Sequence, residues 1–208
     1  MSDWIDLTMK IDQDYLPYPG DDNLVLNWKK TFENSGYNLS EIKMSMHLGT
    51  HIDFKKHCLD KNDYPDFSRF IGKANVLKIN LSNKIIKTSE IITEYNKLTD
   101  KFSTIIFNFN HGKLFNTKEY YDIPKFEPTI LDFFINNNIK LIGADLPSFE
   151  YISDKKLKMH KEVFNNDIYI IENLTNLNKL KNNIYFIALP LNIANIEASI
   201  VRAIAKNL

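Results

Sequence analysis

The sequence contains a single cysteine, Cys58, among its 208 residues. A lone cysteine cannot form an internal disulfide, so we expect a reducing, cytoplasmic environment. No apolar run is long enough to cross a bilayer. The charged start and apolar run of a signal peptide are also missing. The sequence therefore predicts a protein with no membrane partner.

Neither sign of charge is in excess, since 26 lysine and arginine residues stand against 26 aspartate and glutamate residues. A nucleic-acid-binding protein would show a basic excess or a clustered basic face, and no basic block is present. We therefore expect no nucleic-acid partner. With 44% hydrophobic residues, the chain can bury a substantial core, and its length suits one domain over 1–208.

The most informative stretch, 47–57, reads His-Leu-Gly-Thr-His-Ile-Asp-Phe-Lys-Lys-His and holds three of the five histidines. Its odd positions include His47, Gly49, His51 and Asp53, while the even positions from 44 to 54 are mostly apolar. This period of two predicts a strand with one apolar and one polar face. In a helix, by contrast, Asp53 would point roughly 200° away from His51.

A flat strand would not bring these side chains to one metal ion. Residues four apart in a strand are separated by roughly 13 Å, whereas nitrogen-to-metal bonds measure only about 2.0–2.1 Å. Gly49 permits a bend or bulge between His47 and His51, and Thr50 can supply a supporting hydroxyl. Two imidazoles and the carboxylate of Asp53 leave a coordination position for water, as in catalytic metal sites.

Other polar residues stand at the ends of apolar segments, and the residues alone leave their roles open. Glu172 ends the apolar run 168–172 and needs a partner there, but it also suits the first turn of a following helix. His160 is a candidate ligand or an ordinary helix-surface residue. Asp145 and Ser148 follow a strand, where ligands collect in α/β folds. We expect Asp145 or Ser148 to orient a ligand histidine or the substrate; the alternative is that Asp145 caps the next helix.

Aromatic residues in two loops are candidates for the walls of a substrate pocket. Tyr18 lies in the proline-rich arm 15–21, and Phe67 lies in the loop 58–70 that follows the histidine motif. The alternative is that Tyr18 and Trp28 cover a hydrophobic edge or a subunit contact. For His111, a lone loop histidine, we expect exposure to solvent or a local hydrogen bond.

Strands and helices are expected to alternate along the chain, which predicts an α/β fold. Strands are expected at 3–11, 24–31, 37–46, 74–81, 104–109, 140–145, 168–172 and 184–191, and helices at 88–98 and 128–138. Residues 197–206 have helical spacing.

The stretch 47–57 resembles the signature His-x-Gly-Thr-His-x-Asp-x-Pro-x-His of the cyclase-like metal-dependent hydrolases, the family of kynurenine formamidase and isatin hydrolase. One position differs, because Lys55 stands where the family has proline. Residues 143–148 are similar to the family's Gly-x-Asp-x-x-Ser, and 197–205 resemble its terminal Ser-Pro-Val-Arg-Ala. His160 and Glu172 match a family histidine that is followed twelve residues later by glutamate.

The resemblance implies a single-domain, cyclase-like swivelling β/β/α fold, in which helices flank a central mixed sheet with a barrel-like core. It implies a strand at 197–206 in place of the helix. It also implies that His160 and Glu172 hold a second metal ion, with Asp53 bridging the two ions. A homodimer or homotetramer is expected from the same resemblance.

The resemblance further implies a metal-dependent amide hydrolase in which metal-bound hydroxide attacks a carbonyl. His57 is then the catalytic proton shuttle, or alternatively a ligand to the second metal. Zn²⁺ suits the ligands best and Mn²⁺ is compatible with them. The expected small-molecule substrate is an aromatic formamide, with N-formylkynurenine first. The alternatives are a cyclic amide, as in isatin hydrolase, and a homologue that binds metal or a small molecule without catalysis.

Overall fold

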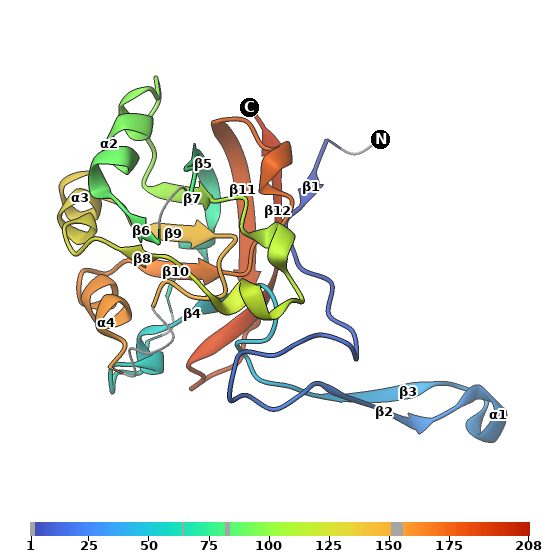
Figure 1. The fold of residues 1–208 in the computed structure, drawn as a ribbon. Helices are drawn as coiled ribbons and strands as arrows, with labels where there is room; N and C mark the ends of the chain where they lie inside the picture. The colour runs from blue at the N-terminus through green and yellow to red at the C-terminus, as the bar shows by residue number, and fades with distance from the viewer. Residues whose placement is uncertain (1–2, 64, 82–83, 151–155) are drawn as a thin grey trace.

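A closed, mixed sheet forms the centre of the computed structural model, which describes residues 3–63, 65–81, 84–150 and 156–208 (Figure 1). Its strand order is β1-β12-β11-β5-β7-β9-β10-β4, and β4 also pairs with β12, so the sheet closes on itself. The strands are β1 (Ile5–Asp6), β4 (His51–Asp53), β5 (Ile71–Lys78), β7 (Thr104–Asn108), β9 (Leu141–Ala144), β10 (Tyr169–Glu172), β11 (Asn183–Pro190) and β12 (Ala198–Asn207). The barrel-like mixed core expected from the sequence is confirmed.

Strands β5, β7, β9 and β10 run parallel, and the remaining pairs in this sheet are antiparallel. Helices α2 (Thr88–Asn96), α3 (Ile130–Asn136) and α4 (Lys158–Asn165) lie along one side of the sheet (Figure 1). A short parallel pair, β6 (Ile85–Ile86) with β8 (Lys125–Phe126), accompanies them. Parallel strands that are covered on both faces read as continuous apolar runs, as β7 and β10 do.

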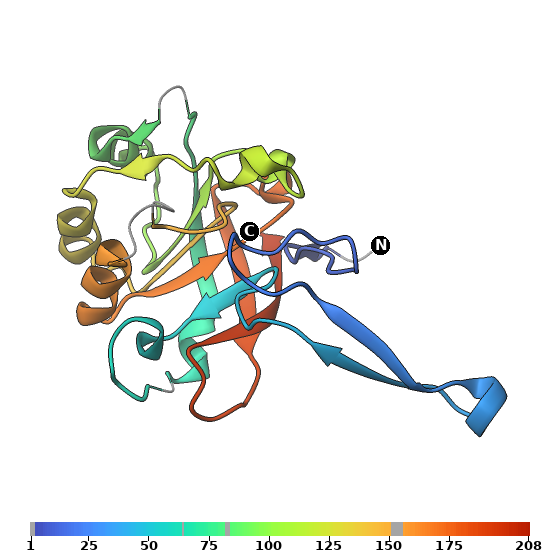
Figure 2. The ribbon, with the colours of Figure 1, turned by 60° about the horizontal axis from the view of Figure 1, so that its bottom comes forward.

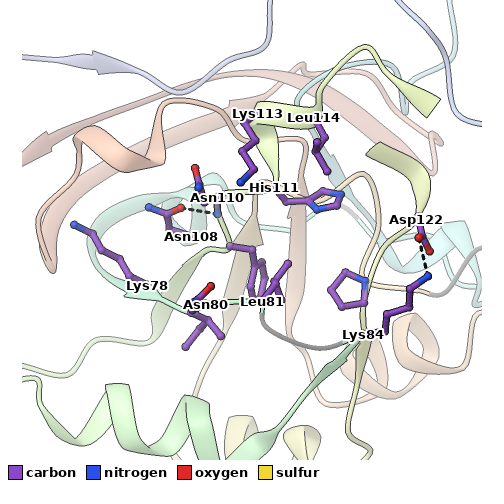
Figure 3. A pocket seen from close by; sticks show the side chains of 13 residues that line it. Lys78, Asn80, Leu81, Lys84, Asn108, Asn110, His111, Lys113, Leu114 and Asp122 are labelled. Carbon is purple, nitrogen blue, oxygen red and sulfur yellow. Dashed lines mark hydrogen bonds and ion pairs between the residues drawn. The ribbon is translucent and has the colours of Figure 1, made fainter. Parts of the chain in front are cut away.

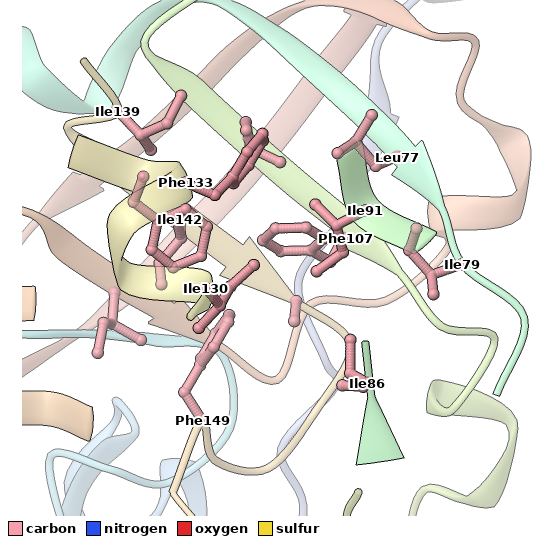
Figure 4. Packing of buried hydrophobic residues seen from close by; sticks show 14 of the residues in the cluster. Leu77, Ile79, Ile86, Ile91, Phe107, Ile130, Phe133, Ile139, Ile142 and Phe149 are labelled. Atoms are coloured by element: carbon pink, nitrogen blue, oxygen red, sulfur yellow. The ribbon is translucent and has the colours of Figure 1, made fainter. Parts of the chain in front are cut away.

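The parallel strands separate two hydrophobic cores. In β7, Ile105 and Phe107 pack into the core beneath the helices, whereas Ile106 between them faces the interior of the barrel. Figure 4 shows the first core, with Phe107 among Ile91, Ile130 and other aliphatic side chains. The alternation follows from the strand period of two. Packing on both faces holds the sheet rigidly beneath the loops that follow its strands.

A hairpin arm projects from this body. It consists of β2 (Val25–Lys30), α1 (Phe32–Ser35) and β3 (Leu39–Lys43), and it extends away from the sheet in both views (Figures 1 and 2). Every residue of the two strands is exposed, although several are large and apolar. Within the described part of the chain, no helix has the length and apolar character that a bilayer crossing requires.

Three expectations about secondary structure need correction. Residues 44–54 do not form one strand, because Ser45–Thr50 make turns and only β4 pairs with the sheet. The first strand is limited to Ile5–Asp6, with an isolated bridge between Thr8 and Leu174. The helical spacing of 197–206 is misleading, since β12 is a strand, as the resemblance implied. There, β12 pairs with β11, β1 and β4, and this pairing outweighs local propensity.

Candidate metal centre and active site

Five structural elements converge on one buried group of polar side chains. The turn before β4, strands β4 and β10, helix α4 and the 3₁₀ turn η1 (Lys55–His57) contribute to it. These side chains are His47, His51, Asp53, His57, His160 and Glu172, and all of them line one pocket. The structure therefore brings together all the residues predicted as metal ligands, together with the predicted proton shuttle.

Gly49 supplies the bend that the sequence requires. Its φ of +69° lies in the left-handed region, and a Cβ there would lie 2.8 Å from the side chain of Ile11. The reversal folds His47 back over β4, so its Nδ1 lies 3.2 Å from Nε2 of His51. Residues that an extended strand would separate by roughly 13 Å thus face the same point.

Asp53 lies at the centre of the group. Its Oδ1 is 3.0 Å from Nδ1 of His47 and 3.2 Å from Nε2 of His51, and its Oδ2 is 3.3 Å from Nε2 of His160. Both oxygens are buried, and neither has a hydrogen-bond partner within the described residues. A buried carboxylate whose oxygens accept no hydrogen bond is strongly disfavoured. A cation held jointly by these oxygens and imidazoles removes that cost, so the residues present fit a divalent metal.

Glu172 lies on the opposite side of the same buried polar group. In the β4–β10 ladder it lies directly across from His51, and its Oε2 is 3.5 Å from Nε2 of that histidine. Its Oε1 lies 3.3 Å from Nε2 of His160 and accepts a hydrogen bond from the backbone N–H of Phe149 at 2.9 Å. Two sets of potential ligand atoms, His51–Asp53–Glu172 and His47–Asp53–His57, each fit within 4.8 Å and share Asp53.

The electrostatics of the site favour positive charge. Burial alone would lower the pKa of His51, but the carboxylates of Asp53 and Glu172 outweigh burial and raise this pKa to about 10. Conversely, burial would raise the pKa of Asp53, yet the surrounding histidines hold it well below its ordinary value. His57 differs, because burial lowers the pKa of its imidazole.

Backbone groups orient the ligand histidine on β4. Nδ1 of His51 lies 2.9 Å from the carbonyl oxygen of Gly49, which places the proton on Nδ1 and turns the Nε2 lone pair toward the site. The side-chain amide of Asn173 donates to the same carbonyl at 2.9 Å. Thr50 donates its hydroxyl to the carbonyl of Asn173 and accepts from the N–H of Met9. Thr50 therefore holds this turn in place without reaching the ligand atoms.

Two buried residues of the site were missed by the sequence reasoning. Glu150 accepts a hydrogen bond from the N–H of Met159 at 2.8 Å, and the same oxygen lies 3.5 Å from Nδ1 of His160. It fixes both the start of α4 and the orientation of the histidine. Asn173, the second, is held in the left-handed region at φ +58°. The sequence held a signal for each residue. Glu150 is an acid within the apolar segment 146–151, and Asn173 is an asparagine directly after Glu172.

Asp145 has a different role from either of those predicted. Its carboxylate accepts hydrogen bonds from the N–H groups of Phe109, His111 and Gly112, at 2.9, 2.7 and 3.0 Å. It therefore organises the loop after β7, and it neither orients a ligand histidine nor caps the next helix. His111 is buried rather than solvated, with its Nε2 2.8 Å from the carbonyl oxygen of Tyr120.

The pocket above the polar group has a volume of about 200 Å³. An apolar cavity of about 150 Å³ accommodates benzene, so this space suits a small aromatic molecule. Besides the polar group, its lining is Tyr15, Tyr18, Asp21, Tyr121, Pro147, Ser148, Leu157 and Asn173. Tyr18 and Ser148 thus lie where the sequence predicted. Phe67 does not line the pocket, because η2 (Phe67–Phe70) turns its ring outward, with 63% of it exposed.

Comparisons with known proteins agree with this geometry. Residues 5–151 match the model of the cyclase family, described as "Putative cyclase". The chain is 30% identical over 212 residues to a kynurenine formamidase of Bacillus thuringiensis subsp. konkukian, covering 99% of this chain and 98% of the relative. It is 31% identical over 213 residues to a kynurenine formamidase of Bacillus mycoides, with coverage of 99% and 98%.

Solved structures share the fold. An isatin hydrolase bound to the product analogue thioisatinate superposes with a TM-score of 0.84 at 16% identity, over 97% of this chain and 91% of that chain. A structure titled "Potential Metal-Dependent Hydrolase With Cyclase Activity" gives a TM-score of 0.79 at 18% identity, over 97% and 96%. Sequence match, fold and site agree, so the chain belongs to the cyclase family and is a hydrolase.

Proposed function

We propose that this chain is a metal-dependent hydrolase of a small aromatic formamide, with N-formylkynurenine as the first candidate substrate. The observation that carries the proposal is the buried carboxylate of Asp53. It lies among three histidines and Glu172 at the base of a tyrosine-lined pocket. The relatives that match over nearly the whole chain are kynurenine formamidases, which supports this choice of substrate.

His47, His51 and Asp53 would hold the first divalent ion, and His160 and Glu172 would hold a second with Asp53 between them. Imidazole and carboxylate donors favour Zn²⁺ and remain compatible with Mn²⁺. When bound, a divalent cation supplies Lewis-acid chemistry, since it polarises a carbonyl oxygen and lowers the pKa of water. Glu150 and the carbonyl of Gly49 hold the ligand imidazoles in place for this purpose.

His57 is the group that would move protons. Its ring centroid lies 4.4 Å from that of His47 and 5.6 Å from that of His160, and it faces the pocket. From there its imidazole can accept a proton from the attacking water and deliver one to the amide nitrogen, which must be protonated to leave. Its membership in the His47–Asp53–His57 group makes a ligand role the competing assignment.

Tyrosines form the substrate-facing wall. Tyr18 packs edge-on against Tyr121, with ring centroids 5.8 Å apart, and Tyr15 lines the same pocket. Burial, with a smaller contribution from nearby acids such as Glu172, raises the pKa of Tyr18 to about 12. Its phenol therefore stays neutral and remains a hydrogen-bond donor near pH 7. Flat rings and neutral donors suit a planar aromatic amide.

The test is an assay of protein reconstituted separately with Zn²⁺ and Mn²⁺, with N-formylkynurenine and isatin as substrates. Metal content is measured by plasma mass spectrometry for the natural protein and for the variants His57→Ala and His51→Ala. We expect formamide hydrolysis, retained metal but lost activity in His57→Ala, and loss of both in His51→Ala. Loss of metal in His57→Ala assigns that residue as a ligand instead.

Three other results of the same assay contradict parts of the proposal. Faster hydrolysis of isatin than of N-formylkynurenine would identify a cyclic amide, rather than a formamide, as the substrate. Bound metal without turnover of either compound indicates a homologue that only binds metal or a small molecule. Protein that takes up neither ion refutes the metal site altogether.

We also propose that the chain forms a homodimer through the β2–β3 arm, the homotetramer being a further association of such dimers. An isolated two-stranded hairpin is at best marginally stable in water. The arm nevertheless exposes 60% of Trp28 and 70% of Phe32, together with Leu39 and Ile42. Contiguous exposed apolar residues of this kind mark association sites. The cytoplasmic location stays a prediction from the lone cysteine.

A further inference from the structure

A second cavity lies at the carboxyl ends of the parallel strands β5 and β7 (Figure 3). Its volume is about 640 Å³, within the range of small-molecule sites. Its lining comes from 78–81, Lys84, 108–111, 113–114, Asp122 and Pro124, and it shares none of these residues with the catalytic pocket. In α/β sheets, ligands collect beyond the carboxyl ends of parallel strands, which is where this cavity opens.

Unpaired positive charge lines the cavity. Lys78 ends β5 and Lys113 lies in η3 (Gly112–Leu114), and neither forms an ion pair within the residues that the structure describes. The only acidic side chain of the lining, Asp122, is engaged by Lys84 at 2.8 Å. Figure 3 shows Lys78 at one end of the cavity and the Lys84–Asp122 pair at the other. The lining thus carries an excess of two positive charges.

An oriented amide adds a hydrogen-bond donor. Asn108 is buried at the end of β7, and its Oδ1 accepts from the backbone N–H of Asn110 at 3.0 Å. That bond turns Nδ2 of Asn108 to the side where Lys78 lies, as Figure 3 shows. Within the described residues, the hydrogen bond of the Asn108 side chain is the one that its Oδ1 accepts, which leaves Nδ2 available. Asn108 lines the cavity, so this amide can donate to an acceptor that a ligand supplies.

The loop after β7, which carries Lys113, is held in shape before any ligand binds. Asp145 accepts three backbone N–H bonds from the loop, at Phe109, His111 and Gly112. The ring of His111 stacks on Tyr120 with centroids 5.4 Å apart. A preformed site avoids much of the ordering cost of binding.

We propose that this cavity is a binding site for a small organic anion, a carboxylate or a phosphate monoester. Lys78, Lys113 and the amide of Asn108 would contact its charged group. Apolar side chains complete the lining and suit the uncharged part of such a ligand: Ile79, Leu81, Phe109, Leu114 and Pro124. Hydrogen bonds that lysine and amide donors make to an anion are charge-assisted, and such bonds are stronger than those between neutral groups.

The experiment uses amide-resolved NMR of the metal-loaded protein, titrated separately with inorganic phosphate and with benzoate. The Asn108 side-chain amide and the backbone amides of Asn110 and Gly112 report on the cavity, whereas that of Phe54 reports on the catalytic side. We expect saturable shifts of the cavity signals. Phosphate and benzoate distinguish the two ligand classes, because a shift with only one of them assigns the class.

Variants then test the groups assigned to the anion. Lys78→Ala combined with Lys113→Ala is expected to weaken binding about tenfold or more. Asn108→Asp keeps the acceptor for Asn110 but replaces the amide donor with an anion, and it should abolish binding while the fold persists. The matched control combines Lys73→Ala with Lys101→Ala, which removes equal charge near the amino end of β5 and just before β7.

Two results would overturn the assignment. One is an absence of saturable shifts at Asn108, Asn110 and Gly112 with both anions. The other is an equal loss of affinity in the control variant, since this would show a general charge effect rather than a site. Melting temperatures of all variants, measured in the same buffer, separate lost binding from lost folding.

Discussion

Lys55, which replaces the proline of the family signature, is at the centre of an ion-pair cluster beside the active site. Its Nζ lies 2.8 Å from Oδ1 of Asp167 and 3.5 Å from Oδ2 of Asp63. Arg69 contacts the other oxygen of Asp167 at 2.6 Å, and Tyr169 donates to Asp63. The cluster connects η1, which ends at the proposed proton shuttle, with the start of β10. Replacing Lys55 therefore tests how this chain compensates for the missing proline.

Truncation of Lys55 to alanine should cost about 1 kcal/mol in the free energy of unfolding. The lysine side chain is 20% exposed and that of Asp167 is 39% exposed, so the pair is partly screened and contributes about 0.5–1 kcal/mol. The ammonium also lies 5.6 Å from the ring centroid of Tyr169, a cation–π contact that adds about 0.5 kcal/mol. Asp167 keeps Arg69 as a partner in the variant, which limits the loss.

Lys55→Pro should be less harmful than Lys55→Ala. Phe54 is extended at φ −104° and ψ 163°, as the residue before a proline must be. Lys55 is the first residue of η1, where proline is tolerated, and proline then stabilises by about 0.4–1 kcal/mol through the unfolded chain. The expected order of stability is therefore the natural protein, then the proline variant, then the alanine variant.

Equilibrium unfolding in urea, at neutral pH and again near pH 3, measures these differences. Burial would raise the pKa of Asp167, but Lys55 and Arg69 hold it below its ordinary value of 3.8. A lowered folded-state pKa gives stability that is complete above 3.8 and lost as pH falls through the lowered value. The gap between the natural protein and Lys55→Ala should therefore shrink at acidic pH.

The control is Lys97→Ala, which removes an exposed pair with Glu94 at 2.6 Å and should change little. Equal effects of the two alanine variants at neutral pH would refute the cluster as a stabilising device. So would a proline variant less stable than the alanine variant, because the backbone argument would then be wrong.

Removing the metal with a chelator should lower the melting temperature, since an ion at 100 times its dissociation constant stabilises by about 2.7 kcal/mol; an unchanged scan would argue against bound metal. Glu150→Gln keeps the acceptor for Met159 but loses its charge, so metal affinity in a competition titration should fall about tenfold, and full affinity would exclude this positioning role. Trp28→Glu with Phe32→Glu should give monomers by light scattering without loss of melting temperature, whereas an unchanged mass would place the interface elsewhere. Gly49→Ala should destabilise the chain by about 1–3 kcal/mol, because φ is +69° there, and an unaffected unfolding midpoint would contradict the tight turn.

Local sequence was sufficient for features that depend on neighbouring residues. Gly49 between two histidines predicted a bend or bulge, and the structure has a left-handed turn at that residue. Strands were predicted at 104–109 and 140–145, and the structure has β7 and β9 there. By itself, however, helical spacing at 197–206 was wrong, because the partners of β12 lie far away in the chain.

The sequence by itself determined the fold class, the bend in the histidine motif and the donor types around Asp53, because these follow from backbone preference and side-chain chemistry. Only the tertiary structure decided that His160 and Glu172 lie about 3.3 Å apart, that Glu150 orients the histidine, that Asp145 holds a different loop and that Phe67 faces outward. The physical reason is closure of the sheet. Pairing of β4 with both β10 and β12 brings together residues more than 100 positions apart, and no local pattern encodes that distance.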